Sequence, residues 1–294
     1  MEKSPSRAGE GAERAGLVAR AKAYPFARPA HSYLYCNGSA LELVRLRGDR
    51  LEGGRLERAE IRQRGVRLAF ADYLRHEGIA RPAPMAERVP VIAHGSNGAP
   101  AHLERKFRDT GRDEVIPVLR ARLKDFDIVF APHFAPYGSI PATLTPSPGT
   151  AVTVSITYLD RVQLALMHAT EIAGVNYAYG RLTGARLEPD GPGMEADGPG
   201  MDDHVFCYLT RHGNLLLDGA PVAFTPISAK ARALVQRTQE EMLGHARDVI
   251  APGAQLDRFI LELIEDRALR AKRTARLRER AEPLEGSFFE IIEG

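Results

Sequence analysis

Segments typical of strands and segments typical of helices are separated along this chain, and their order restricts the fold more than any other feature. Residues 89–224 are dense in β-branched and aromatic residues, with Gly and Pro at the expected turns. Residues 225–294 instead space apolar residues three and four apart, which is typical of helices. A run of strands followed by a run of helices predicts an α+β fold rather than alternating βαβ units.

Two further zones precede the strand-dense region. Residues 1–23 are polar and lack the apolar centre of a signal peptide, so we expect a disordered lead-in. Residues 24–88 predict an α/β extension, with a hairpin about Asn37-Gly38 followed by a strand that passes into a short helix. Further along, residues 190–203 repeat the sequence DGPGM without apolar periodicity, and we expect an exposed, mobile loop there.

Composition excludes several classes of protein. The chain of 294 residues is 44% hydrophobic, and its 40 basic residues nearly balance 38 acidic ones. The formal net charge of +2 therefore favours neither nucleic acid nor a membrane as the main partner. No stretch is apolar and long enough to span a bilayer. Cys36 and Cys207 form neither a metal motif nor a disulfide framework, so we expect a reduced, cytoplasmic setting.

One basic segment keeps an alternative partner open. Seven of the fourteen residues from 267 to 280 are basic, which suits a helix that binds nucleic acid or an acidic protein. Acidic residues lie just upstream at Glu262, Glu265 and Asp266. A solvated helix face with charges of both signs explains this pattern better.

The apolar run Val89–Ala93 ends abruptly in His94-Gly95-Ser96-Asn97. Glycine lets a backbone approach a ligand closely and adopt positive φ, so successive N–H groups here could hold an oxygen anion. An ordinary tight turn explains the same residues. A third interpretation makes Ser96 a nucleophile, but the nucleophile elbow needs a glycine two residues earlier, where this chain has His94.

A glutamate ends the helix predicted over residues 160–171. Asp160 is the expected N-cap, and the apolar face of the helix runs into Glu171. Burial there would raise the pKa of Glu171 and suit it to proton transfer. A solvated glutamate at a helix end is the alternative. His168 stands three residues earlier and could share a metal with Glu171, although no third ligand is visible at metal spacing.

These pieces, in this order, resemble the gamma-glutamylcyclotransferase superfamily. Its signature is a strand ending in Tyr-Gly-Ser-Asn, further strands with Gly and Pro turns, a helix ending in a catalytic glutamate, and a strand bearing a tyrosine. The resemblance covers residues 89–224, and His94 stands where the family usually has the aromatic residue. It implies a small β-barrel with packed helices, to which the N-terminal extension and the C-terminal helices are added.

The resemblance also implies an enzyme. It would act on a γ-glutamyl amine or γ-glutamyl peptide and release 5-oxoproline and a free amine, with Glu171 as general acid and base and with no metal or organic cofactor. A non-catalytic module that binds a small molecule on the same fold is the alternative, which His94 favours. A homo-oligomer stays open. The residues expected to bind the substrate are His94, Gly95, Ser96, Asn97, Tyr137 and Tyr177.

Overall fold

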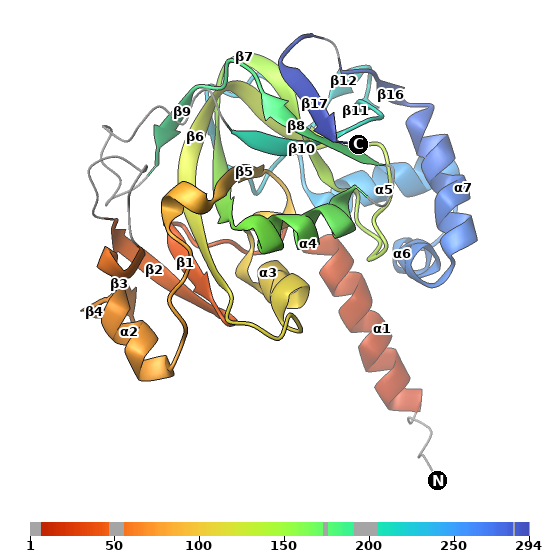
Figure 1. Ribbon diagram of the computed structural model, residues 1–294. Coiled ribbons are helices and arrows are strands. Elements are labelled where there is room, and N and C mark those ends of the chain that lie inside the picture. Colours follow the sequence, from red (N-terminus) through yellow and green to blue (C-terminus); the bar gives the residue numbers. More distant parts are fainter. Residues whose placement is uncertain (1–6, 47–55, 173–175, 191–204, 285, 294) are drawn as a thin grey trace.

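A mixed β-sheet forms the centre of the protein, and helices pack around it (Figure 1). The computed structural model describes residues 7–46, 56–172, 176–190, 205–284 and 286–293. Neighbours along the main path of the sheet are, in order, β17 (Phe289–Glu293), β8 (Tyr177–Leu182), β10 (Phe206–Thr210), β5 (Val89–Ala93), β7 (Ala142–Leu159), β6 (Val115–Phe130), β1 (Tyr33–Cys36), β2 (Ser39–Arg45), β3 (Glu60–Gln63) and β4 (Val66–Ala69).

Shorter strands and the helices complete the described structure. Beside the main path lie β9 (Leu187–Pro189), β13 (Ala223–Phe224), β14 (Ala229–Lys230) and β15 (Gln236–Arg237). A separate small sheet contains β11 (Asn214–Leu217), β12 (Ala220–Pro221) and β16 (Ala281–Glu282). The α-helices are α1 (Arg7–Lys22), α2 (Phe70–Glu77), α3 (Pro100–Phe107), α4 (Arg161–Glu171), α5 (Gln239–Ile250), α6 (Leu256–Glu265) and α7 (Arg267–Arg278). The 3-10 turns are η2 (Leu56–Arg58), η3 (Met85–Glu87) and η4 (Ser96–Gly98). The α+β class predicted from the sequence is confirmed.

Two long antiparallel strands, β6 and β7, form the longest pair in the sheet. They contain 16 and 18 residues and pair from Val118 opposite Thr157 to Phe130 opposite Ala142. The register shifts at Phe126. Such an irregularity bends the pair and increases its twist. The two strands can therefore pair with neighbouring strands that run in different directions.

A closed barrel, which the family resemblance implied, is not found among the described strands. The main path stays open, with β17 at one end and β4 at the other. The reason is that segments from outside residues 89–224 pair with β6 and with β8, at the two edges of the sheet formed by those residues. Strand β1, from the N-terminal extension, pairs with β6, and β17, from near the C-terminus, pairs with β8. The sheet therefore continues outward instead of closing on itself.

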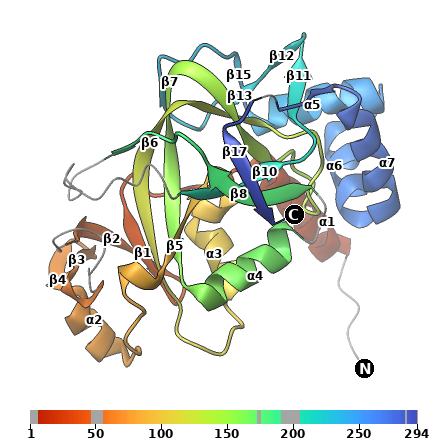
Figure 2. The same cartoon turned by 45° about the horizontal axis from the view of Figure 1, so that its top comes forward.

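The N-terminal segment is ordered where it is described, so the expected disorder was wrong for residues 7–22. These residues form α1, which packs beside α5 and α6 (Figures 1 and 2). Val18 and Ala21 are buried, and Lys22 Nζ lies 2.7 Å from Glu240 Oε1 and 2.8 Å from Asp257 Oδ1. The helix was not predicted because its residues are polar on average. Two apolar residues three apart are nevertheless enough to anchor it to the C-terminal helices.

Other sequence predictions have mixed outcomes. The hairpin about Asn37-Gly38 is confirmed as β1–β2, and the following strand and helix as β4 and α2. The C-terminal region contains the expected helices, but residues 225–238 hold β14 and β15, and the chain returns to the sheet as β17. Thr238 caps α5 in a capping box with Glu241, which explains why that helix begins at Gln239. Apart from Asp190, the DGPGM repeats lie outside the described residues.

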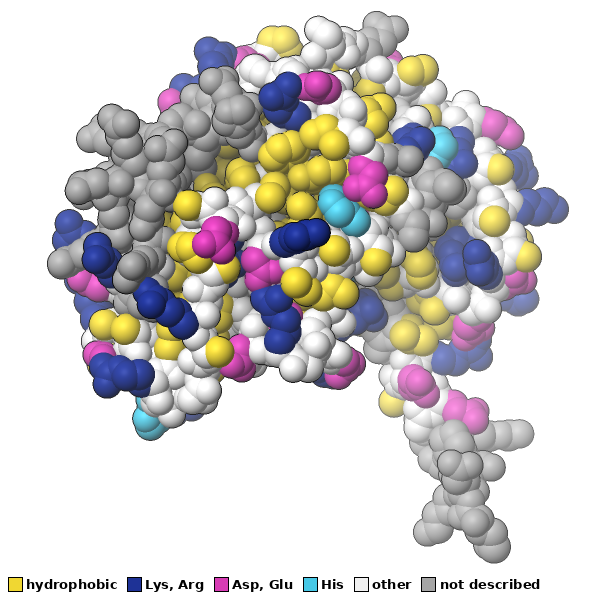
Figure 3. Space-filling model, viewed as in Figure 1, with side chains coloured by type: hydrophobic (Ala, Val, Ile, Leu, Met, Phe, Trp, Pro, Cys, Tyr) yellow, Lys and Arg dark blue, Asp and Glu magenta, His cyan; other side chains and the backbone are white. Residues whose placement is uncertain are grey.

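Hydrophobic side chains gather on one face, over β8 and β17 (Figure 3). Ile291 and Ile292 of β17 expose 64% and 57% of their surface. The C-terminal helices and the β1–β4 extension lie at opposite ends of the sheet (Figures 1 and 2). Among the described helices, none combines the length and the apolar character that crossing a bilayer requires.

Candidate functional site

The loop after β5 enters the protein core against Tyr24. A Cβ atom added to Gly95 would lie 2.4 Å from the Tyr24 hydroxyl oxygen, so only glycine fits. That hydroxyl accepts a hydrogen bond of 2.9 Å from the Ala142 N–H. Gly95 has φ of −98°, outside the left-handed region. Of the two properties that glycine offers, close approach and positive φ, Gly95 uses the first.

Glu171 ends α4 next to a lysine from the preceding helix. Asp160 caps α4 as predicted, in a capping box with Gln163. At the other end, Lys106 Nζ of α3 lies 2.5 Å from Glu171 Oε1 and 2.7 Å from Thr170 Oγ1. The Glu171 side chain exposes 18% of its surface and that of Lys106 only 10%. Because α3 directly follows the loop, this ion pair fixes the end of α4 beside it.

The pKa of Glu171 is lowered, against the prediction from the sequence. Burial alone raises this pKa, because it penalises the charged carboxylate. The positive charge of Lys106 and its hydrogen bond to the carboxylate, with a smaller contribution from Asn97, outweigh burial. Glu171 is therefore ionised at neutral pH and is ready to accept a proton, although it is a weaker base than an unpaired buried carboxylate.

The residues singled out in the sequence lie together. Asn97 helps to lower the pKa of Glu171, and the charge of Glu171 adds to the effect of burial in raising the pKa of Tyr137 and of Tyr177. His94 Nε2 and the Tyr177 hydroxyl both reach the carbonyl oxygen of Ala142, at 3.2 Å and 3.0 Å. We call this group, with Gly95, the loop–glutamate cluster. Its members are His94, Gly95, Ser96, Asn97, Tyr137, Glu171 and Tyr177.

Two histidines that the sequence analysis missed border the cluster. His102 of α3 is buried, with Nε2 3.4 Å from Ser96 Oγ. His133 is buried with its ring edge-on to Tyr177, at 5.3 Å between centroids. Burial lowers the pKa of His102 to about 4 and that of His133 to about 3, so both rings are neutral at pH 7.

The signal for His102 and Lys106 was present but indirect. Both lie on the helix that begins three residues after Asn97, and they are four apart, so they share one helix face. Treating the loop and its following helix as one unit would have placed them beside Ser96. Tyr24 offered no comparable signal, because it precedes the region of family resemblance.

His168 and Glu171 face different partners, which removes the shared metal suggested by their spacing. His168 Nδ1 lies 2.8 Å from the Tyr208 hydroxyl, and its ring packs edge-on against Tyr179 at 4.6 Å. Glu171 instead contacts Lys106. Across the part of the chain that the structure describes, no three His, Cys, Asp or Glu side chains are grouped so that they could hold a metal ion.

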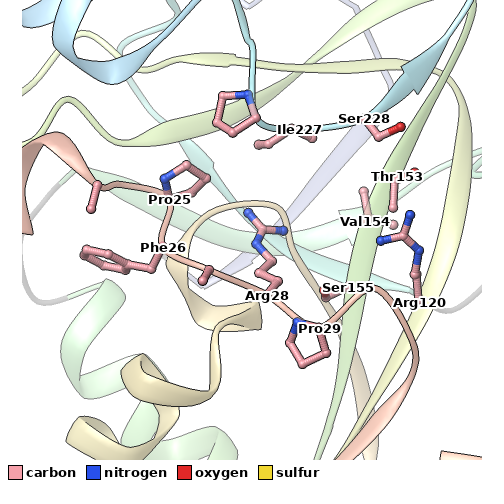
Figure 4. A pocket seen from close by; sticks show the side chains of 13 residues that line it. Pro25, Phe26, Arg28, Pro29, Arg120, Thr153, Val154, Ser155, Ile227 and Ser228 are labelled. Carbon is pink, nitrogen blue, oxygen red and sulfur yellow. The ribbon is translucent and has the colours of Figure 1, made fainter. Parts of the chain in front are cut away.

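A cavity of about 310 Å³ adjoins the loop on another side (Figure 4). Arg28 lines it and donates hydrogen bonds to the carbonyl oxygens of Ala93 and His94, at 3.3 Å and 3.0 Å. Arg120, Thr153, Ser155 and Ser228 bring further polar groups to its wall. We call it the arginine cavity. Arg28 therefore links the cavity to the start of the loop formed by residues 94–97.

Comparisons of the chain with protein-family models, with curated proteins and with solved structures found no match. The family resemblance consequently rests on the order of the motifs in the sequence. The loop–glutamate cluster rests on the contacts described above, which do not depend on that resemblance.

Proposed function

We propose that this protein is a cofactor-independent cyclotransferase that converts a γ-glutamyl amine or γ-glutamyl peptide into 5-oxoproline and a free amine. The observation that carries the proposal is the ion pair of 2.5 Å between Glu171 and Lys106, because Lys106 lies on the helix that follows the loop of residues 94–97. This pair supports a carboxylate close to a backbone loop, which the reaction requires. Tyr137 and Tyr177, expected to contact the substrate, adjoin the same loop.

In the proposed mechanism Glu171 removes a proton from the α-ammonium group of the substrate. The freed amine attacks the γ-carbonyl carbon, and orientation of the two groups is worth about 7–11 kcal/mol. N–H groups of the loop at residues 94–97 hold the oxyanion, each contributing about 3–4 kcal/mol. The bond from the γ-carbon to the leaving amine then breaks. Glu171 returns its proton to that amine. The ring nitrogen still carries two hydrogens after the attack, and it gives one of them to the vacated carboxylate, from which this proton passes to the released amine. The products are therefore 5-oxoproline and the free amine in its ammonium form.

Lys106 has a defined part in this mechanism. By lowering the pKa of Glu171 it keeps the carboxylate in the form that accepts a proton. Lys106 occupies the carboxylate in the absence of substrate. The substrate ammonium must therefore displace Lys106, and the ammonium group of Lys106 then becomes available to the substrate.

The proposal is tested by incubating the protein with a panel of γ-glutamyl amines and measuring 5-oxoproline by mass spectrometry. Glu171→Gln keeps the size of the side chain and cannot accept the proton, so we expect it to fold and to lose turnover. Glu293→Gln is the matched control, because Glu293 faces the same helix through His168, at 3.8 Å, and lies outside the cluster. Equal activity of wild type and Glu171→Gln would remove Glu171 from the mechanism.

A binding module on the same fold is the second candidate. The lowered pKa of Glu171 favours it, because a carboxylate held by Lys106 is a weaker base. In that case neither wild type nor Glu171→Gln releases 5-oxoproline, while both bind γ-glutamyl compounds in calorimetry. The same panel therefore separates the two candidates.

The contact between Ser96 and His102 supports a third candidate, acyl transfer through a serine. Neutral His102 could accept the Ser96 proton over 3.4 Å. However, His102 Nδ1 is buried and finds no hydrogen-bond partner in the described residues, so nothing there orients the ring as a catalytic triad would. A covalent adduct on Ser96 in mass spectrometry would establish this candidate.

A further inference from the structure

The arginine cavity combines positive charge with hydroxyl groups. It is enclosed by the segment after α1, by β6 and β7, and by the turn before β14. Figure 4 shows the guanidinium groups of Arg28 and Arg120 on different sides of the same space, with the Ser228 hydroxyl at its border. Thr153 and Ser155 of β7 add two more hydroxyls. This wall offers hydrogen-bond donors, of which the Thr153 hydroxyl also donates to Asp190 Oδ2 at 3.4 Å.

The charge of Arg28 is not neutralised within the described part of the chain. Its guanidinium donates to two backbone carbonyls, and none of the ion pairs found among the described residues involves it. Burial lowers the pKa of Arg28, and the charge of Arg120 lowers it further. The two carbonyls hold the guanidinium in one orientation while leaving part of its donor capacity for a ligand.

Arg120 is only partly neutralised, because it shares one carboxylate. Its Nε lies 2.8 Å from Asp190 Oδ2, and an Arg122 nitrogen lies 2.9 Å from Asp190 Oδ1. Glu188 pairs with Lys124 at 2.5 Å and reaches Arg122 only at 4.0 Å. Around the cavity, positive charge therefore exceeds negative charge among the described residues.

We propose that the arginine cavity binds the oxyanion group of a small molecule, a carboxylate or a phosphate. Two guanidinium groups supply paired N–H donors that match adjacent oxygen atoms, and hydroxyls supply the remaining hydrogen bonds. A volume of about 310 Å³ suits a small molecule and excludes a macromolecule. This proposal does not depend on the cyclotransferase activity, since Glu171 lines no part of this cavity.

Calorimetric titration of the full chain with inorganic phosphate and with glutarate tests the proposal, in chloride buffer of constant ionic strength. We expect at least one anion to bind. Arg28→Met should lower the affinity for that anion about tenfold or more. Arg28→Lys keeps the charge but loses the paired donors, so we expect an intermediate loss. Arg258→Met is the control, because Arg258 is exposed on α6 and pairs with Glu262.

Ser228→Ala keeps the test decisive if Arg28→Met does not fold. This change leaves every hydrogen bond of Arg28 intact, and we expect a loss of affinity of several fold. Binding of phosphate alone, or of glutarate alone, identifies the source of the oxyanion. Failure of both anions to bind overturns the proposal, as does an equal loss in Arg258→Met. Glu171→Gln should bind the anion as wild type does, so this result is separate from the fate of the cyclotransferase proposal.

Discussion

Buried charge is held in different ways on the two sides of the loop formed by residues 94–97. On one side Glu171 is paired with Lys106, so the two charges largely cancel. On the other side the Arg28 guanidinium donates only to carbonyl oxygens among the described residues, so no carboxylate there neutralises its charge. Burying a charge is costly unless it is paired. The first side is therefore stable when empty, whereas the proposed anion would complete the second.

Removal of Lys106 should have the largest effect on this comparison. Lys106→Met leaves Glu171 as an unpaired carboxylate, and we expect a loss of about 3–5 kcal/mol in the free energy of unfolding at pH 7. Chemical denaturation measures this loss. Lys106→Arg keeps the charge and should lose less. Lys124→Met, at a more exposed pair with Glu188, should lose no more than about 1 kcal/mol.

The loss of stability caused by Lys106→Met should also depend on pH. In wild type the lowered pKa of Glu171 means that its stabilisation is present above its unfolded pKa, near 4.5, and is lost as pH falls through the folded value. Without Lys106, burial raises the pKa instead. The difference between wild type and Lys106→Met should then shrink as pH falls. A constant difference across this range would contradict the ion pair.

The buried histidines beside the cluster should produce the next effect. The folded pKa values of His94 and His102 are about 4, below the ordinary value of 6.5, so the unfolded chain binds protons first. Stability should consequently fall as pH drops from 6.5 to 4, by about 3 kcal/mol for each ring. Denaturation midpoints at several pH values should show a shallower slope for His102→Gln. The slope of the exposed control His76→Gln should match wild type.

Crowding at Gly95 should have a smaller effect. Gly95→Ala places a Cβ atom against the Tyr24 hydroxyl, and we expect a loss of about 2 kcal/mol, measured by the thermal midpoint. In a Tyr24→Phe background, where that hydroxyl is absent, the same change should cost clearly less. Gly244→Ala is the control, because its Cβ would meet nothing within 4 Å on α5 and should stabilise the helix slightly.

Ser96→Ala should have the smallest effect. It removes a long contact of 3.4 Å with His102 and keeps the backbone N–H, so we expect a loss of about 1 kcal/mol or less. If the loop acts through its backbone, 5-oxoproline release should persist in Ser96→Ala and drop further in Gly95→Val. Complete inactivity of a folded Ser96→Ala would instead favour the serine nucleophile.

Local features of the sequence predicted local structure well. Asn37-Gly38 specified a hairpin, and Asp160 specified a helix start, because turn and cap chemistry depends on a few adjacent residues. Motif order also grouped Glu171 with the loop of residues 94–97, and Lys106, on the helix after that loop, contacts Glu171. Their roles in a reaction stay predictions.

Features that depend on distant partners were not predictable in the same way. The direction of the pKa shift of Glu171 is decided by Lys106, which is 65 residues away in sequence. Closure of the sheet is decided by whether β1 and β17 occupy its edges, and they come from opposite ends of the described chain. Helix α1 depends on contacts with α5 and α6. Periodicity and composition carry no information about such contacts.

The place of β17 in the sheet also has a consequence for synthesis of the chain. Ile291 lies opposite Gly180, where a Cβ atom would come within 2.3 Å of the Glu290 carbonyl oxygen. At about 5–20 residues per second of synthesis, β8 emerges several seconds before β17 is made. During that interval the edge of β8 that later pairs with β17 must stay unpaired in the nascent chain. Translation speed over residues 183–293 thus sets how long this edge is open to incorrect partners.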